Sequence, residues 1–220
     1  MSAVFGSFMA LLKKGDHLLS CNAVFGSTHT VISKYLPKYG IDFSYVSTNA
    51  TEAEWEAAIT PNTKMIYLES PTNPGLDILD IAMISRVAKK HHIILNVDNC
   101  FATPIGQTPI DLGADLVVHS ATKWIDGQGR VLGGAVVGKK DLIHEIYLFC
   151  RSTGPSMSPF NAWVLSKSLE TLEVRMDRHS ANAQYIAEKL EGNDKINFVK
   201  YPFLASHPQH AIAKAQMKNG

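Results

Sequence analysis

Six short apolar runs recur between residues 17 and 137, and helix-like segments separate most of them. Several runs are continuously apolar rather than alternating, which is typical of strands covered on both faces. Regular alternation of strands and helices predicts an α/β fold with a mainly parallel sheet sandwiched by helices. The predicted strands cover residues 17–21, 43–46, 65–69, 93–98, 116–119 and 134–137.

The segments between these runs carry helix signals. Helices are predicted over 2–14, 27–39, 51–59 and 80–91. Gly15 and Gly40 follow the first two, as glycine often does at a helix end. Thr51 and Glu54 have the spacing of a capping box, which supports the start of the third helix. In the fourth, one face is apolar: Ile81, Ile84, Val87 and Ala88.

The pattern changes after residue 139. A helix is expected over 141–150, one long helix over 159–190, which contains no Pro or Gly, and a new strand over 196–201. We therefore divide the chain into a cofactor-binding α/β domain (1–158), a connecting helix (159–192) and the start of a smaller C-terminal α/β domain (193–220). Met1 stands near a helix start with no strand before it, and the strand at 196–201 has no partner after it. We therefore expect the chain to be truncated at both ends.

Composition argues against several classes of protein. The 21 basic and 20 acidic residues nearly cancel, which disfavours binding to nucleic acid or an anionic membrane. No apolar run reaches the roughly 18 residues that span a bilayer. Cys21, Cys100 and Cys150 are too few and too scattered for a disulfide framework or a Cys-based zinc site. We expect a cytoplasmic protein without a bound metal.

Chemically useful side chains follow several of the predicted strands. In an open parallel sheet, ligands bind beyond the carboxyl ends of the strands, so these side chains are expected to converge. They comprise an aromatic ring, an amide, a carboxylate, two hydroxyls and an amine: Phe25, Asn73, Asp98, Ser120, Thr122 and Lys123. Pyridoxal phosphate needs this set, because a lysine amine binds it and a carboxylate keeps its ring nitrogen protonated.

Each of these residues also has a more ordinary interpretation when taken alone. Most lysines are solvated, so Lys123 by itself indicates nothing. Asp98 would serve as a turn cap with Asn99, and Asn73 as a turn residue between two prolines. Phe25 would be an ordinary core residue. The joint occurrence of these residues at one predicted sheet edge favours the cofactor over the separate interpretations.

Four motifs carry a resemblance to a known family. ESPTNP (69–74), VDN (97–99), HSATK (119–123) and LKKGDH (12–17) are similar to the Cys/Met-metabolism family of pyridoxal-phosphate enzymes, over essentially the whole chain. The resemblance implies the large cofactor domain of a fold-type I enzyme. Three further stretches resemble the O-succinylhomoserine sulfhydrylase branch: residues 126–134, 153–165 and 201–209.

The resemblance implies a role for each candidate residue. Lys123 would be the Schiff-base lysine and would shuttle protons, and Asp98 would pair with the pyridine nitrogen. Asn73 would lie near the ring oxygen and the substrate carboxylate. Phe25 would stack on the ring where much of the family has tyrosine, so a tyrosine role in proton transfer does not carry over.

The cofactor phosphate is assigned by the same resemblance. Ser120 and Thr122 would hold it, helped by the backbone N–H of Met1 at a helix start. Arg175 and Arg178 lie one turn apart on the predicted long helix, and we interpret them as a solvated face or a subunit contact.

The implied activity is γ-replacement on O-succinylhomoserine with sulfide, giving homocysteine in methionine biosynthesis (trans-sulfuration) by a homodimer or homotetramer. Two alternatives remain open. One is a cystathionine γ-synthase or a β- or γ-lyase of the same family. The other is an inactive oligomerising fragment, because the family's N-terminal tyrosine and arginine and its C-terminal substrate arginine have no counterpart here.

Overall fold

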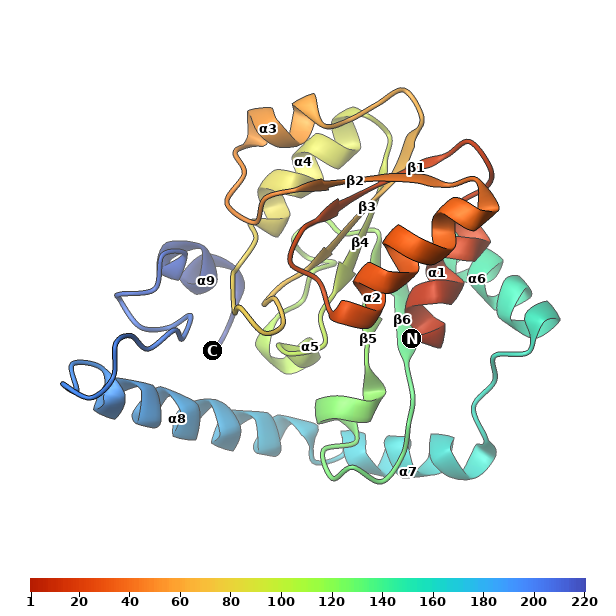
Figure 1. Ribbon diagram of the computed structural model, residues 1–220. Helices are drawn as coiled ribbons and strands as arrows, with labels where there is room; N and C mark the ends of the chain where they lie inside the picture. The colour runs from red at the N-terminus through yellow and green to blue at the C-terminus, as the bar shows by residue number, and fades with distance from the viewer.

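A computed structural model describes residues 1–220 and contains a six-stranded sheet with helices on both faces (Figure 1). The strands lie in the order β2-β1-β3-β4-β5-β6. All neighbours are parallel except β6, which runs antiparallel to β5. This confirms the predicted α/β class. The strands are β1 (His17–Cys21), β2 (Asp42–Val46), β3 (Thr63–Glu69), β4 (Ile94–Asp98), β5 (Leu116–His119) and β6 (Ala135–Gly138).

Helices α3 and α4 lie together on one side of the sheet, and α1 and α6 pack together on the other (Figure 1). The first part of the chain forms α1 (Ser2–Leu11), α2 (Gly26–Thr30), the π-helical η1 (Val31–Tyr35), the 3-10 helix η2 (Leu36–Tyr39), α3 (Glu52–Ala57), α4 (Ile81–Lys90) and α5 (Thr103–Gly106). The second part forms the π-helical turn η3 (Ala121–Ile125), α6 (Lys140–Thr153), α7 (Pro159–Leu169), α8 (Leu172–Leu190) and α9 (His210–Gln216).

Local sequence explains where several helices begin and end. The Thr51 hydroxyl accepts the N–H of Glu54 at 3.3 Å, and the Glu54 carboxylate accepts the N–H of Thr51 at 2.7 Å, so the predicted capping box is confirmed. The Asp80 carboxylate caps α4 by accepting the Met83 N–H at 2.8 Å. Gly40 ends η2 with a φ of 72°, which glycine adopts at little cost.

The main core lies along both faces of the sheet and contains 27 buried residues. β1 is buried at every position, as expected for a strand covered on both sides. Trp55 of α3 and Phe8 of α1 enter this core from opposite helices and are almost fully buried. The Phe8 ring meets Tyr67 of β3 edge-on, with the ring centroids 5.0 Å apart. These contacts fix the strand ends that carry the candidate site.

Two predictions for the second half are wrong. The predicted single helix over 159–190 is two helices, α7 and α8, separated at Glu170–Thr171. The Thr171 hydroxyl donates to the Ser168 carbonyl at 3.2 Å, which compensates for the interrupted helical bonding. Residues 196–201 form no strand, because a strand needs a hydrogen-bonded neighbour and none lies beside this segment. The short helices α5 and α9 have no counterpart among the predicted elements.

Residues near the C-terminus pack against the α/β sheet layer. Met217 forms an antiparallel bridge with Gln107, and the Gln216 amide donates to the Leu79 carbonyl at 2.9 Å. The Lys200 amine lies 2.6 Å from the Asp77 carboxylate. A small buried cluster joins the two parts: Ile78, Ala102, Ala213 and Met217. The division of the chain into three domains stays a prediction.

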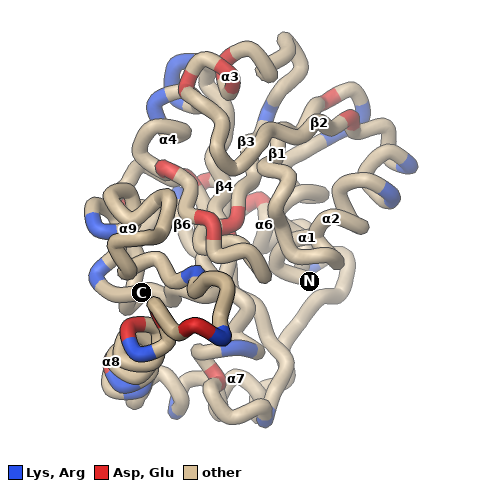
Figure 2. The backbone as a smooth tube through the Cα atoms, turned by 60° about the vertical axis from the view of Figure 1, so that its left-hand side comes forward, with Lys and Arg blue, Asp and Glu red and all other residues tan.

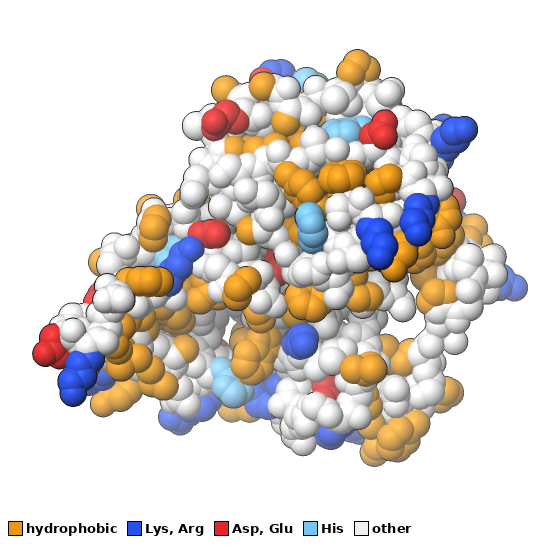
Figure 3. Space-filling view, in the orientation of Figure 1, with side chains coloured by type: hydrophobic (Ala, Val, Ile, Leu, Met, Phe, Trp, Pro, Cys, Tyr) orange, Lys and Arg blue, Asp and Glu red, His pale blue; other side chains and the backbone are white.

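Charged and large apolar side chains are both exposed on the helices that follow residue 158. α8 carries charges of both signs, seen almost end-on in Figure 2, and no helix has the apolar length needed to cross a bilayer. Large apolar side chains are nevertheless exposed on α7 and α8, where Figure 3 shows hydrophobic colouring along the lower edge. They include Phe160, Trp163, Val174, Tyr185 and Ile186.

Candidate active site at the carboxyl ends of the strands

The parallel strands β1, β3, β4 and β5 end at the same edge of the sheet. Glu69, the last residue of β3, pairs in register with Asp98, the last residue of β4. The loops that follow these strands carry Phe25, Asn73 and Lys123. The structure therefore brings the candidate residues to one edge, as parallel topology requires.

Asp98 is buried and holds two hydrogen bonds. The Tyr67 hydroxyl donates to Oδ2 at 2.9 Å, and the Cys100 N–H donates to Oδ1 at 3.1 Å. Burial raises the pKa of Asp98 above its ordinary value, while the Tyr67 and Cys100 bonds oppose that shift. Asn99 does not share a turn cap with it, because its amide bonds to the carbonyls of Thr103 and Gln107 instead. Asp98 keeps acceptor capacity for a further partner.

Lys123 lies in η3, directly after β5, with an exposed side chain that makes no hydrogen bond or ion pair. Its backbone departs from helical geometry, with φ −88° and ψ −117°. The preceding carbonyl of Ser120 accepts the Lys123 N–H at 3.1 Å. The amine is free, and only its backbone is constrained.

Cys100 lies within electrostatic reach of both Asp98 and Lys123. Burial, followed by the charge of Asp98, raises the pKa of the Cys100 thiol to about 12, whereas the nearby Lys123 lowers it. The Asp98 carboxylate, at the end of β4, and the Lys123 amine, in η3 after β5, thus influence the same thiol. The register of the sheet agrees, because Asp98 pairs with Val118 of β5, two residues before Ser120, where the segment of Lys123 begins.

Glu69 links two of the loops, although it is not among the predicted site residues. Its Oε2 accepts the N–H of Phe25 at 2.7 Å, and its Oε1 accepts the N–H of Asn73 at 2.8 Å. The side chain is buried. Burial and the charge of Asp98 raise the pKa of Glu69 to about 7, and the two N–H donors oppose the shift. One carboxylate therefore fixes the backbone beside both the aromatic and the amide candidates.

Phe25 and Asn73 themselves remain available. The Phe25 ring is 43% exposed at the start of α2, so it is not the core residue of the ordinary interpretation. The Asn73 side-chain amide has no hydrogen-bond partner in the structure, and its loop is half-buried. Both side chains can therefore contact a ligand without breaking an existing bond.

The Thr122 hydroxyl, predicted to bind the cofactor phosphate, is already hydrogen-bonded within the protein. Its hydroxyl donates to the Gly133 carbonyl at 3.1 Å and accepts the Gly133 N–H at 3.0 Å. It thereby ties the segment of Lys123 to the beginning of the stretch before β6. Ser120 has no side-chain bond and precedes η3 in an extended conformation. Of the two predicted phosphate hydroxyls, only Ser120 is free to donate.

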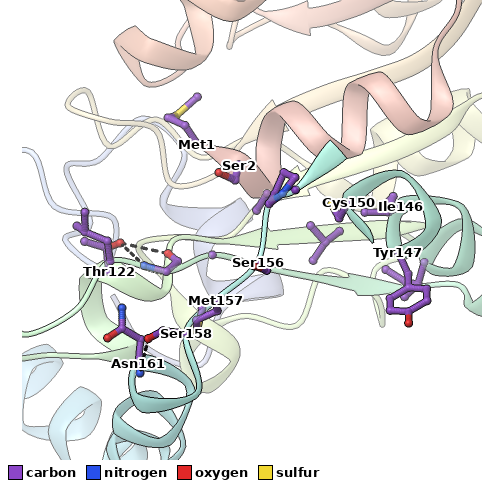
Figure 4. Close-up of a pocket in the computed structure, with 18 residues that line it drawn as sticks. Met1, Ser2, Thr122, Ile146, Tyr147, Cys150, Ser156, Met157, Ser158 and Asn161 are labelled. Atoms are coloured by element: carbon purple, nitrogen blue, oxygen red, sulfur yellow. Dashed lines mark hydrogen bonds between the residues drawn. The ribbon is translucent and has the colours of Figure 1, made fainter. Parts of the chain in front are cut away.

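A cavity of about 720 Å³ opens at the start of α1 and is bordered by Met1, Ser2 and Thr122 (Figure 4). Met157 and Asn161, from the segment around the start of α7, border it on another side (Figure 4). The N–H groups of Ser2 and Ala3 have no acceptor within the helix, because the first helical bond runs from Phe5 to Met1. Such a helix start attracts anions. Lys123 and Asp98 lie outside this cavity lining.

These residues fit pyridoxal phosphate. A buried carboxylate with spare acceptor sites suits a cationic N–H partner such as a protonated pyridine, which in turn favours the ionised form of Asp98. A free amine, an exposed aromatic ring and unpaired helix N–H groups are present at the same edge of the sheet. Arg175, by contrast, is no part of a solvated face: its guanidinium bonds to carbonyl groups of η3.

Comparisons with known proteins point in the same direction. The model of the family described as Cys/Met metabolism PLP-dependent enzyme matches residues 1–220. The chain is 48% identical over 216 residues to the O-succinylhomoserine sulfhydrylase of Pseudomonas aeruginosa, covering 98% of this chain and 53% of that protein. It is 42% identical over 220 residues to the L-methionine gamma-lyase of Porphyromonas gingivalis, covering 99% of this chain and 55% of that protein.

Among solved structures, the crystal structure of metB from Corynebacterium glutamicum superposes with a TM-score of 0.95 at 39% identity. The match covers 100% of this chain and 57% of that one. The chain therefore spans about half the length of the curated relatives it matches.

Proposed function

The chain belongs to the Cys/Met-metabolism family of pyridoxal-phosphate-dependent enzymes, and on that premise we propose that it carries out γ-replacement on O-succinylhomoserine with sulfide. The observation that supports its chemistry most strongly is the placement of a buried carboxylate, Asp98, at the end of β4 and of an exposed amine, Lys123, just after the neighbouring β5. The relative that matches at 48% identity is named for this reaction.

Pyridoxal phosphate, when bound, supplies an electron-withdrawing ring that stabilises negative charge on the substrate carbon next to the amine. Lys123 carries the cofactor and then moves protons: it removes the proton from the substrate's Cα and later one from Cβ. An amine without hydrogen bonds is free to reach both carbons. Its fixed backbone keeps that movement local.

Asp98 holds a proton at the pyridine nitrogen of the cofactor. The Tyr67 hydroxyl and the Cys100 N–H keep its carboxylate oriented, since each bonds a different oxygen. Phe25 would stack on one face of the ring, and Asn73 would orient the ring oxygen and the substrate carboxylate. Glu69 holds the loops of both residues in place.

The start of α1 binds the phosphate. Ser2 and Ala3, whose N–H groups have no acceptor within the helix, border a cavity that Thr122 also borders. The Ser120 hydroxyl, which has no partner in the protein, would donate to a phosphate oxygen. Thr122 contributes by keeping the segment of Lys123 attached to Gly133, because its own hydroxyl is already engaged there.

The choice of reaction is tested by a competition between acceptors. The purified protein, supplied with pyridoxal phosphate and O-succinylhomoserine, is given sulfide or cysteine at equal concentration. We expect homocysteine from sulfide at a higher rate than cystathionine from cysteine. Equal or faster use of cysteine would instead identify a cystathionine γ-synthase. Release of ammonia from L-methionine or cystathionine, without succinate chemistry, would identify a lyase, as the name of the second relative suggests.

We also propose that the protein assembles as a homodimer or homotetramer. Phe160 and Trp163 on α7 and Val174, Tyr185 and Ile186 on α8 are largely exposed apolar side chains. The Phe160 and Trp163 rings lie together, with their centroids 6.0 Å apart, and contiguous exposed apolar side chains are typical of contact surfaces between proteins. Light scattering after gel filtration measures the mass: a multiple of the chain mass supports the proposal, and a monomer at micromolar concentration contradicts it.

A further inference from the structure

The guanidinium of Arg175, on α8, reaches across to the segment that carries Lys123. Its Nη1 donates to the Trp124 carbonyl at 2.7 Å, and its Nη2 donates to the Ile125 carbonyl at 3.2 Å. The same Nη2 donates to the Ser168 carbonyl at 3.0 Å, and Nε donates to the Thr171 hydroxyl at 3.1 Å. One side chain therefore joins η3 to the ends of α7 and α8 that meet beside it.

These carbonyl groups need an outside donor. η3 ends at Ile125, and the last carbonyls of any helical turn have no following N–H to accept. A cation near such a terminus also interacts favourably with the local dipole. Arg175 supplies both the donors and the positive charge. The carbonyls that it bonds belong to the two residues after Lys123, whose own backbone departs from helical geometry. Thr122, on the other side of Lys123, is tied to Gly133.

Gly127 shows that the chain makes room for this guanidinium. It has a φ of 74°, and a Cβ placed there would lie 2.2 Å from Arg175 Nη1 and 2.7 Å from its Cζ. A side chain at 127 would push the guanidinium away from the Trp124 carbonyl. Gly129, two positions later, has a similar φ of 68° but nothing within 4 Å of a built Cβ.

A second set of hydrogen bonds holds residues 126–130, which follow η3. The Asp126 carboxylate, which is fully buried, accepts the Arg130 N–H at 2.7 Å and its Nε–H at 3.0 Å. Arg130 Nη2 donates in turn to the Ser168 hydroxyl at 2.6 Å. Ser168 thus accepts a hydrogen bond from each arginine: from Arg130 at its hydroxyl and from Arg175 at its carbonyl. The segment that contains Lys123 is therefore held by hydrogen bonds to the junction between α7 and α8.

We infer that Arg175 is a positioning residue for Lys123: by holding the carbonyls of Trp124 and Ile125 against the α7–α8 junction, it sets where the lysine amine meets the cofactor. The inference rests on the proposed role of Lys123. Arg175 itself contacts neither substrate nor cofactor. Its effect is transmitted through the backbone of η3.

The test compares Arg175→Ala and Arg175→Lys with Arg178→Ala, an exposed arginine on the same helix that makes no hydrogen bond or ion pair. Three quantities are measured in the purified protein: the Kd for pyridoxal phosphate, the pH at which the visible band of the attached cofactor changes, and the Tm without cofactor. For Arg175→Ala we expect a Kd increased about tenfold, the size expected for losing charged hydrogen bonds, and a shifted pH profile. Arg175→Lys restores part of both, and Arg178→Ala changes neither.

A double-mutant cycle with Gly127 isolates the contact. Gly127→Ala combines backbone strain with the clash against Arg175, whereas Gly129→Ala imposes strain alone. Gly127→Ala is therefore expected to raise the Kd more than Gly129→Ala. In the Arg175→Ala background the difference between the two glycine variants should shrink, because the guanidinium is gone and only the Trp124 carbonyl, 3.3 Å from a Cβ at 127, still distinguishes the two positions.

Lys123→Ala separates the role of Arg175 from the role of Lys123. Loss of the visible band in Lys123→Ala, together with an unchanged Kd and pH profile in Arg175→Ala, would overturn the positioning role alone. That role is also overturned if Arg175→Ala lowers only the Tm, or if Arg178→Ala matches its effects. A visible band that persists in Lys123→Ala would overturn the proposed role of Lys123 itself.

Discussion

The Tyr67 hydroxyl donates a hydrogen bond of 2.9 Å to Oδ2 of Asp98, and both side chains are buried. Tyr67 comes from the middle of β3 and Asp98 from the end of β4, the neighbouring strand. The bond counteracts the effect of burial on the pKa of Asp98, so it favours the ionised carboxylate that a protonated pyridine requires.

Tyr67→Phe removes this donor while keeping the ring that packs on Phe8. The pKa of Asp98 rises further, so a larger fraction of the carboxyl is protonated at low pH. We expect the affinity for pyridoxal phosphate to fall more steeply on acidification than in the unsubstituted protein, as measured by absorbance titration. Tyr45→Phe, which loses only an exposed bond to His29, is the control. Identical pH dependence in both variants would contradict the assigned function of the bond.

Glu69→Gln weakens the link between the loops of Phe25 and Asn73. Glutamine keeps one acceptor oxygen and gains donors, so it can accept only one of the two N–H groups well. We expect faster hydrogen exchange at the Phe25 or Asn73 amide and weaker cofactor binding. Glu52→Gln, in an exposed ion pair with Arg86, is the control. Unchanged exchange at both amides would show that the bridge does not hold the loops.

Phe25→Ala removes the ring proposed to stack on the cofactor. Because the ring is 43% exposed, the Tm without cofactor should change little. The Kd for pyridoxal phosphate should rise roughly three- to tenfold, the usual range for one aromatic contact. Phe198→Ala, which removes an exposed ring far along the chain, should leave the Kd unchanged. A Kd unaffected by Phe25→Ala would exclude stacking.

His119, at the end of β5, makes stability depend on pH. Burial lowers its pKa to about 4, so the unfolded state binds a proton more readily than the folded state between about pH 6.5 and 4. This group therefore reduces the free energy of unfolding as the pH falls through that window, by up to about 3 kcal/mol. Denaturant unfolding of the protein and of His119→Gln should differ by this pH-dependent amount. Parallel curves from pH 7 to 4 would contradict it.

Much of the fold could be predicted because its signals are local. The ranges predicted for 17–21 and 116–119 agree with β1 and β5, since continuous apolar runs mark strands buried on both faces. The break between α7 and α8 contains no Pro or Gly and depends on bonds from Thr171 and Arg175, so no local pattern indicates it. The strand expected over 196–201 does not form because pairing is a long-range property.

The site residues also divide into those that local sequence indicates and those that only the folded chain reveals. Position and chemistry at the strand ends predict four of them, although their roles stay predictions: Lys123, Asp98, Asn73 and Phe25. Tyr67 lies within an apolar strand, where no local signal marks it as a partner of Asp98. Glu69 stands within the ESPTNP motif, and a carboxylate ending a buried strand is a usable signal. Arg175 acts on the Trp124 carbonyl across 51 positions of sequence, which only the folded chain reveals.

Covalent mapping tests most directly whether Lys123 carries the cofactor. The protein is incubated with pyridoxal phosphate, reduced with borohydride, digested with trypsin and analysed by mass spectrometry. Trypsin does not cleave after a modified lysine, so we predict one labelled peptide spanning residues 91–130, absent from Lys123→Ala. A stable label on another lysine, or only an unlabelled peptide ending at Lys123, would contradict the proposed role.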